Sequence, residues 1–267
     1  MAIETVCIIG GGHLGGAIAE GLIRSGGMPP KNVTVTRRRP ELLRHLADMG
    51  VRVSLNNKEA AAEAQAVLLC VKPHQAAAAI EDVKPALDSR QTVVSTVAGL
   101  TLKTLSEALP ANPIFRAMPN TAVAIADSMT CLSTPPAFAG QIGPVQELFG
   151  KIGKTLVIGE ELMDAATVLG ACGIAYALRF LRAMTQGGIE IGFSSEMAQF
   201  VAAQTLHGAA SLVVETGNHP EQEIDKVTTP MGITIAGLNE MEHNGFSSAL
   251  IKGVGMSFRR IAKKTAQ

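Results

Sequence analysis

Residues 6–20 read VCIIGGGHLGGAIAE, and this stretch decides most of what the chain can be. A short apolar run enters a turn in which Gly10, Gly12 and Gly15 have the spacing G-x-G-x-x-G, and an alanine-rich helical pattern follows. In a strand–turn–helix context, the first glycine allows a sharp turn, the second lets backbone approach a pyrophosphate, and the third lets the helix pack closely on the strand. The helix N-terminus would offer free N–H groups and partial positive charge to the phosphates. A glycine-rich turn that binds nothing is the alternative, but its place at the head of an alternating strand–helix pattern favours a dinucleotide site.

The end of the second expected strand indicates which dinucleotide is bound. An NAD site usually has Asp or Glu here, which accepts hydrogen bonds from the ribose 2′-hydroxyl group. This chain has Thr36-Arg37-Arg38-Arg39 instead, with no acidic residue before Glu41. A guanidinium group would bind a 2′-phosphate through charge-assisted hydrogen bonds, and a hydroxyl group could add one more. A solvated basic turn is the alternative. We expect NADPH as the cofactor, with NADH as the second choice.

The composition excludes several classes of function. The chain has 267 residues, and its 23 basic residues balance 23 acidic ones, so there is no net positive field to hold a nucleic acid. Aromatic residues make up 3% and tryptophan is absent, which argues against a surface that stacks bases. The most apolar stretch, residues 165–178, is short for a membrane span, and the first expected strand leaves no room for a signal peptide. We expect a cytoplasmic protein that binds neither nucleic acid nor membrane.

The four cysteines are widely spaced and lie mostly within apolar runs. None has the spacing of a metal site or of a CxxC redox pair. We expect small buried thiols in a reducing compartment, and no bound metal.

The chain alternates strands and helices up to about residue 159 and is helical beyond it. The expected strands are Thr5–Ile9, Asn32–Thr36, Ala66–Val71, Thr92–Thr96, Ile114–Met118, Met129–Leu132 and Lys154–Val157. The expected helices are Gly16–Ser25, Pro40–Met49, Asn57–Ala64, Gln75–Val83 and Leu102–Leu109, then two long ones within Met163–Thr216 hinged at Gly192 to Ser194, then Glu221–Val227, Ile233–Asn244 and Phe246–Lys264. This order predicts an α/β fold, with a Rossmann-type, doubly wound parallel sheet over residues 1–159 and an all-helical domain over residues 160–267. Because the helical domain is apolar and poor in aromatic residues, we expect it to be a dimerisation domain, with a self-contained bundle as the alternative.

Three more loops follow expected strands at the edge where open α/β sheets bind ligands. They are Val71-Lys72-Pro73, Val97-Ala98-Gly99 and Pro119-Asn120-Thr121. The small residues of the second loop would let a nicotinamide lie against backbone. Lys72 could reach a phosphate or ribose, and Asn120 could bond the carboxamide or a neighbouring loop. Any one of these loops alone would not indicate a site, but their shared location at one sheet edge does.

Five motifs, in order along almost the whole chain, resemble those of the pyrroline-5-carboxylate reductases. They are Ile9–Gly15, Val71–Pro73, Ser95–Gly99, Arg116–Thr121 and Asp225–Thr234, and the last two are far more specific than a glycine triplet. The resemblance implies reduction of 1-pyrroline-5-carboxylate to L-proline by hydride transfer from NAD(P)H, the last step of proline biosynthesis. It also implies a helical domain that interlocks with its twin, in dimers or larger dimer-based oligomers.

The resemblance also implies roles for individual residues. The family's Ser-Pro-Gly-Gly-x-Thr loop appears here as residues 229–234, so backbone at Met231, Gly232 and Ile233 would receive the substrate carboxylate. The Thr234 hydroxyl would reach the ring nitrogen as the catalytic group. Met231 replaces a glycine, which matters if that position requires a positive φ. Alignment places further residues: Glu160 and Lys226 beside the substrate pocket, Asn57 near the adenosine ribose, and His13 and Leu14 in the glycine loop.

Two other classes of function remain open at this level. One is a reductase of β-hydroxyacids or of another cyclic imine. A β-hydroxyacid reductase would need a catalytic lysine on the first long helix, and no lysine lies between Met163 and Met197. The other is a non-catalytic, NADPH-sensing regulator on the same fold. The substituted residues Met231 and Ile174 would support a regulator, and the retained Thr234 and Gly232 argue against it.

Overall fold

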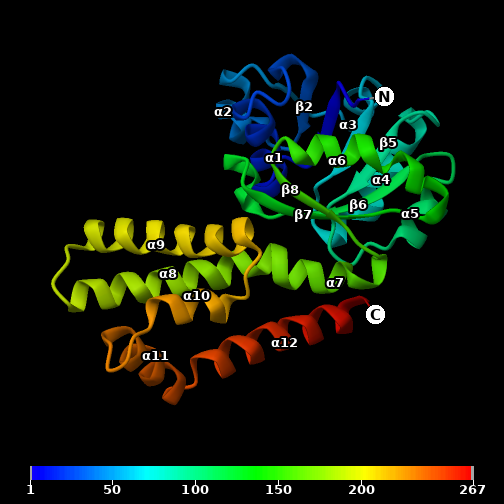
Figure 1. Cartoon of the computed structure of the whole chain (residues 1–267). Helices are drawn as coiled ribbons and strands as arrows, with labels where there is room; N and C mark the ends of the chain where they lie inside the picture. Colours follow the sequence, from blue (N-terminus) through cyan, green and yellow to red (C-terminus); the bar gives the residue numbers. More distant parts are fainter. Residues whose placement is uncertain (1, 266–267) are drawn as a thin grey trace. The chain divides into compact units, whose positions relative to one another are not determined.

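The computed structural model describes residues 2–265, and these form two compact units. The first unit consists of the described residues up to Cys172 together with those from Phe258 onward, and the second is Gly173–Ser257. Figure 1 shows a twisted sheet with helices in the first unit and helices alone in the second. The α/β class predicted from the sequence is therefore confirmed.

The first unit is built on an eight-stranded sheet of order β3-β2-β1-β4-β5-β6-β7-β8. The strands are β1 Val6–Ile9, β2 Val33–Thr36, β3 Arg52–Ser54, β4 Ala66–Leu69, β5 Thr92–Ser95, β6 Ile114–Met118, β7 Ser128–Ser133 and β8 Gly153–Val157. Neighbours from β3 through to β6 pair in parallel, whereas β7 is antiparallel to β6 and parallel to β8. The carboxyl ends of β1, β2, β4 and β5 therefore lie along one edge, where ligands bind in such sheets.

Helices cover both faces of this sheet. They are α1 His13–Arg24, α2 Arg44–Asp48, α3 Asn57–Ala62, α4 Ala76–Val83, α5 Leu102–Ala108 and α6 Ile142–Gly150. Alternate residues of β1 divide between two cores, because successive side chains of a strand point to opposite faces. Ile8 packs in one core with Ile18 of α1 and Phe149 of α6. Cys7 packs in the other core with Ile80 of α4.

The structure corrects three details of the expected pattern. All seven expected strands are present with ends shifted by at most two residues, but β3 and α6 were not predicted. The predicted parallel sheet departs from this pattern at β7, which is antiparallel to β6, so that β7 and β8 run against the other strands. The link from β6 to β7 holds only a 3₁₀ helix, Thr121–Ile125, and a parallel return would need a longer crossover.

The second unit begins inside a long helical run. The run starts at α7 (Met163–Ala166), passes through a π-helical segment at Thr167–Cys172 and continues as α8 (Gly173–Glu190). The next helix, α9 (Ser195–Thr216), lies beside α8 (Figure 1). Ser194 begins α9, because its side chain accepts a hydrogen bond from the backbone N–H of Met197 at 3.3 Å. The hinge predicted at Gly192 to Ser194 is confirmed. The remaining helices are α10 Pro220–Val227, α11 Ile233–His243 and α12 Phe246–Thr265.

The second unit has almost no core of its own within one chain. Of residues 173–257, only Ala198 and Ala202 are buried. Large apolar side chains are exposed instead, among them Ile191, Phe200, Val214 and Ile251. By length and composition alone, the helical runs Glu160–Glu190 and Ser195–Thr216 could each cross a membrane. A face buried against a second copy has the same composition.

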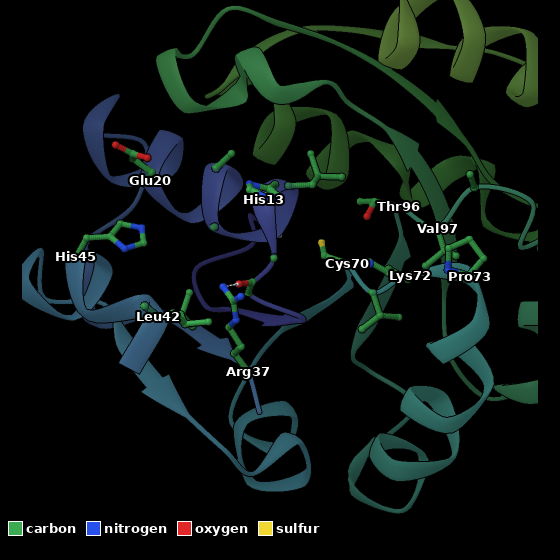
Figure 2. Close-up of a pocket in the computed structure, with 18 residues that line it drawn as sticks. His13, Glu20, Arg37, Leu42, His45, Cys70, Lys72, Pro73, Thr96 and Val97 are labelled. Atoms are coloured by element: carbon green, nitrogen blue, oxygen red, sulfur yellow. Dashed lines mark hydrogen bonds between the residues drawn. The ribbon is translucent and has the colours of Figure 1, made fainter. Parts of the chain in front are cut away.

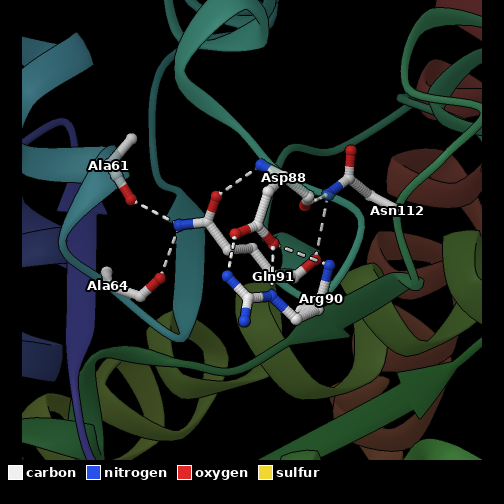
Figure 3. A network of polar contacts seen from close by, with 6 residues as sticks. All are labelled: Ala61, Ala64, Asp88, Arg90, Gln91 and Asn112. Carbon is white, nitrogen blue, oxygen red and sulfur yellow. Dashed lines mark hydrogen bonds and ion pairs between the residues drawn. The ribbon is translucent and has the colours of Figure 1, made fainter.

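A polar network stabilises the sheet edge away from the strands' carboxyl ends (Figure 3). Gln91, directly before β5, donates from Nε2 to the carbonyl groups of Ala61 and Ala64, both at 2.6 Å. Asn112, shortly before β6, donates to the carbonyl oxygens of Asp88 at 2.6 Å and Gln91 at 3.1 Å. Both side chains are buried, so these bonds satisfy polar groups that would otherwise destabilise the fold.

Candidate functional site

Two adjoining cavities, of about 790 and 750 Å³, lie at the carboxyl ends of β1, β2, β4 and β5. Figure 2 shows the first, with Arg37, Cys70, Lys72 and Thr96 facing a common space. The two cavities share the glycine turn and the loop after β4, so one long ligand could contact both. Their combined size suits a dinucleotide, since single ligand pockets commonly measure about 300–1,000 Å³.

The glycine turn has the geometry that its sequence predicts. Gly10 has φ +105°, which an L side chain rarely adopts. A Cβ at Gly15 would overlap the carbonyl oxygen of Gly10, so only glycine lets α1 sit this close to the strand. Gly12 begins α1 without a side-chain cap, and a Cβ there would meet no atom within 4 Å. This open space in front of a helix N-terminus is a cradle that fits a pyrophosphate.

The basic turn after β2 has two parts with different surroundings. Arg37 Nη1 donates to the carbonyl oxygen of Gly11 at 2.7 Å, a bond drawn in Figure 2. The carbonyl of Thr36 also accepts from the backbone N–H groups of Gly10 (3.2 Å) and Gly11 (2.7 Å). Arg37 therefore braces the glycine turn as well as lining the cavities. Arg38, like Arg39, lines the second cavity only.

Most of the predicted cofactor residues meet around these cavities. Those that line one or both are Gly10, Gly12, His13, Leu14, Thr36, Arg37, Arg38, Asn57, Val71, Lys72, Pro73, Val97 and Ala98. Three predicted residues do not line them. Gly15 acts in packing, and Gly99 has φ +77° in the turn after β5. Asn120 donates from Nδ2 to the carbonyl of Gly170 at 3.4 Å and accepts from the N–H of Ala122, so its side chain bonds backbone within the first unit.

The sequence reasoning missed the contribution of helix α4. Ala78, Ala79 and Asp82 of α4 line the second cavity, as do His74 and Gln75 of the 3₁₀ turn directly before it. The order of the elements could have predicted this contribution. Helix α4 follows β4, so its first turns must begin at the ligand-binding edge of the sheet. The periodicity of a short alanine-rich helix did not reveal which face would be turned towards the cavity.

Cys70 lies between the two cavities but is poorly suited to act as a nucleophile. Burial raises the pKa of its thiol to about 12, and a hydrogen bond with Thr96 opposes this only in part. Burial likewise raises the pKa of Cys7 to about 12. Both thiols therefore hold their protons at neutral pH, and only a thiolate attacks or ligates. Within the described part of the chain, no three His, Cys, Asp or Glu side chains gather as a metal site would require.

Glu160 occupies a junction in the first unit. Its Oε1 accepts from Arg116 Nη1 at 3.0 Å and from the backbone N–H of Leu102, the first residue of α5, at 2.5 Å. The Arg116 side chain is only 4% exposed, and its Nε and Nη2 have no hydrogen-bond partner among the described residues. Among the described residues, Glu160 therefore provides the one ion pair that compensates this buried charge. It also fixes the end of the loop that carries Val97 and Ala98.

The loop before α11 contains a residue with left-handed backbone. Met231 has φ +61°, so the position does adopt the left-handed conformation that a glycine would favour. Gly232 begins α11, and Thr234 lies exposed in its first turn. Lys226, at the end of α10, pairs with Glu223 at 2.7 Å. That ammonium group, with an Asn218 hydrogen bond, holds the pKa of Glu223 below its usual value.

Tyr176 on α8 has a hydrogen-bond partner within its own unit. Its hydroxyl lies 2.7 Å from the Ser257 Oγ. This bond joins α8 to α12.

The fold and these cavities define the class of the protein: an oxidoreductase that binds a dinucleotide on a Rossmann-type domain. Residues 5–99 match the family model of NADP oxidoreductases, coenzyme F420-dependent, and residues 160–264 match that of pyrroline-5-carboxylate reductase dimerisation. The second match indicates homo-oligomerisation through the helical part.

The chain belongs to the pyrroline-5-carboxylate reductase family. It is 38% identical to pyrroline-5-carboxylate reductase 2 of Dictyostelium discoideum, over 98% of this chain and 94% of the relative. It is 40% identical to pyrroline-5-carboxylate reductase 1 of the same organism over 98% of its own length, but spans only 50% of that longer relative. The resemblance inferred from sequence motifs is confirmed.

Solved structures agree with this assignment. The pyrroline-5-carboxylate reductase of Coxiella burnetii superposes with a TM-score of 0.85 at 27% identity, covering 97% of this chain and 98% of that one. A Plasmodium falciparum pyrroline carboxylate reductase with NADP bound shares the fold, with a TM-score of 0.88 at 24% identity and coverage of 99% and 98%.

Proposed function

We propose that this chain reduces 1-pyrroline-5-carboxylate to L-proline with NAD(P)H, the last step of proline biosynthesis. The observation that carries the proposal is its 38% identity to a named reductase across nearly the whole length of both chains. The open cradle at Gly12 and the exposed Thr234 at the start of α11 agree with it, because the reaction needs a dinucleotide site and a hydrogen-bonding group for the imine.

The cofactor would be held by the first unit. The N-terminus of α1 would take the pyrophosphate, and the loops holding Lys72 and Ala98 would take the nicotinamide half. The bound cofactor supplies the hydride for the imine carbon. We infer a preference for NADPH over NADH, because Thr36 and Arg38 line the second cavity where an NAD site would carry an acid.

The substrate would be held by the helical part, where chemistry requires little beyond orientation. Backbone N–H groups at Met231, Gly232 and Ile233 would receive the carboxylate at the start of α11. The Thr234 hydroxyl would hold the protonated ring nitrogen, which makes the imine carbon electrophilic. A cyclic imine can arrive protonated, so no strong acid is needed and positioning supplies most of the rate. Glu160 and Lys226 would border this pocket.

The helical domain, residues 160–267, would dimerise by burying its exposed apolar faces against a second copy. Membrane and nucleic acid are not expected partners. All four cysteines are free thiols, which supports a cytoplasmic, reducing location.

The test is the rate of NADPH and NADH oxidation with pyrroline-5-carboxylate, using Thr234→Ala and Thr234→Ser. We expect turnover that requires the substrate and a kcat/KM reduced about 100-fold in the alanine variant, a typical effect of losing one transition-state hydrogen bond. The serine variant keeps the hydroxyl and should lose far less. Thr228→Ala is a matched control, because the Thr228 hydroxyl already donates to the Asp225 carbonyl.

Two outcomes would redirect the assignment. Turnover of another cyclic imine but not of pyrroline-5-carboxylate would assign a different substrate. Binding of NADPH without turnover of either substrate would point to a sensing role.

A further inference from the structure

The second cavity has two chemically different walls. The turn after β2 provides a basic wall with Arg38 and Arg39, whereas α4 provides Ala78, Ala79 and Asp82. The two walls suit different parts of a 2′-phosphorylated nucleotide, because its phosphate is anionic and its base is neutral and planar. The basic wall would hold the phosphate. The α4 wall is then left for the base.

The alanines make the α4 wall suitable for a flat ring. Ala78 and Ala79 present only methyl groups, and no bulky side chain of α4 lines the cavity beside them. A base lying here would have apolar contact on this side. A guanidinium group of the basic wall could stack on the opposite face of the ring.

Asp82 contributes a fixed hydrogen-bond acceptor to the same wall. Its Oδ2 accepts from Asn57 Nδ2 at 2.9 Å, and its Oδ1 lies 3.9 Å from Lys58 Nζ. The side chain is nevertheless 42% exposed. A carboxylate has about four lone-pair sites, so these two contacts leave acceptor capacity for a ligand. An ionised carboxylate accepts hydrogen bonds and donates none.

We propose that Asp82 determines the base specificity of this cavity by accepting a hydrogen bond from the exocyclic amino group of adenine. Asn57 and Lys58 hold the carboxylate in place for this contact. A base with a carbonyl oxygen at that position would place one acceptor against another. This inference rests on the proposed use of NADPH and names the residue that reads its base.

The experiment compares NADPH with its hypoxanthine analogue, in which a carbonyl replaces the amino group. Binding of each is measured by the fluorescence of the reduced nicotinamide, which is the same in both compounds. The proteins are the wild type, Asp82→Asn and the control Glu81→Gln. Glu81 is the exposed neighbour of Asp82 on α4 and does not line either cavity, so the control removes an equal charge.

We expect the wild type and Glu81→Gln to bind NADPH at least about tenfold more tightly than the analogue, as suits a hydrogen bond to a charged group. The ratio should fall below about threefold in Asp82→Asn, because an amide can accept from an amino group or donate to a carbonyl. Using a ratio cancels any general effect of charge on phosphate binding. Equal binding of the two compounds by the wild type, or an unchanged ratio in Asp82→Asn, would overturn this inference alone. Failure of NADPH itself to bind would overturn it together with the proposed function.

Discussion

Cys7 shows how a single buried side chain links stability to pH. It is fully buried on β1, and burial raises its pKa to about 12. In the folded state the Cys7 thiol therefore keeps its proton above pH 9, whereas in the unfolded chain the same thiol loses its proton there. Its contribution to stability is complete below the unfolded pKa and is lost as pH rises towards 12.

We expect the gap in the free energy of unfolding between the wild type and Cys7→Ala to shrink by about 1.4 kcal/mol per pH unit above pH 9. Urea titrations from pH 8 to 11 measure this gap. Val67→Ala is the matched control, because Val67 pairs with Cys7 across the sheet, is equally buried and cannot titrate. The prediction would be contradicted if the difference in free energy of unfolding between the wild type and Cys7→Ala changed as little with pH as the difference between the wild type and Val67→Ala.

At the scale of secondary structure, the short 3₁₀ helix Glu160–Leu162 presents the Glu160 carboxylate to Arg116 and to the start of α5. We expect Glu160→Gln to lower the free energy of unfolding by about 3 kcal/mol, since it leaves the charge of Arg116 buried without a counter-ion. Glutamine can still accept from Leu102, so the change isolates the charge. The control is Glu161→Gln at the exposed neighbouring residue, which should change the free energy of unfolding by less than about 0.5 kcal/mol. Chemical unfolding measures both variants. If Glu160→Gln and Glu161→Gln lowered the free energy of unfolding equally, the ion pair would contribute nothing to stability.

Sequence patterns predicted an element correctly where a local signal determines it. They failed where the element forms only through pairing with a distant strand or where local residues disfavour it. Strands such as Ala66–Leu69 were found because a buried strand reads as an apolar run. Strand β3 was missed because Arg52, Val53 and Ser54 form no such run, and only pairing with β2 makes them a strand. Helix α6 was missed because Gly143 and Pro144 lie in its first turn. Proline is tolerated there, since early helical N–H groups have no partner within the helix.

The candidate site shows the same division. The glycine turn and the loop at Lys72 were predictable because their roles follow from a motif at a strand end. The brace from Arg37 to Gly11 and the pair of Asn57 with Asp82 were not, because each joins residues about 25 apart that only the fold brings together.

For the molecule as a whole, the exposed apolar helices point to assembly. Phe200 is 73% exposed on α9, in a unit with almost no buried side chains. We expect Phe200→Asp to weaken self-association by about 30-fold or more, as charge at the centre of an apolar interface does. Sedimentation velocity over a range of concentrations measures this. Ala111→Asp, on an exposed loop of the first unit, is the control. Association as tight as that of the wild type would place Phe200 outside the interface.

The division of the chain also fixes an order of events during synthesis. The first unit is discontinuous, because residues from Phe258 onward belong with those before Gly173. A ribosome that has just made the cofactor cavities has not yet made the last segment of the unit that contains them. All of residues 173–257 must be translated first, with their apolar faces emerging before the first unit is complete. The nascent chain therefore exposes the apolar helices of the second unit while the first unit is still incomplete. Chaperones would be most needed during this interval.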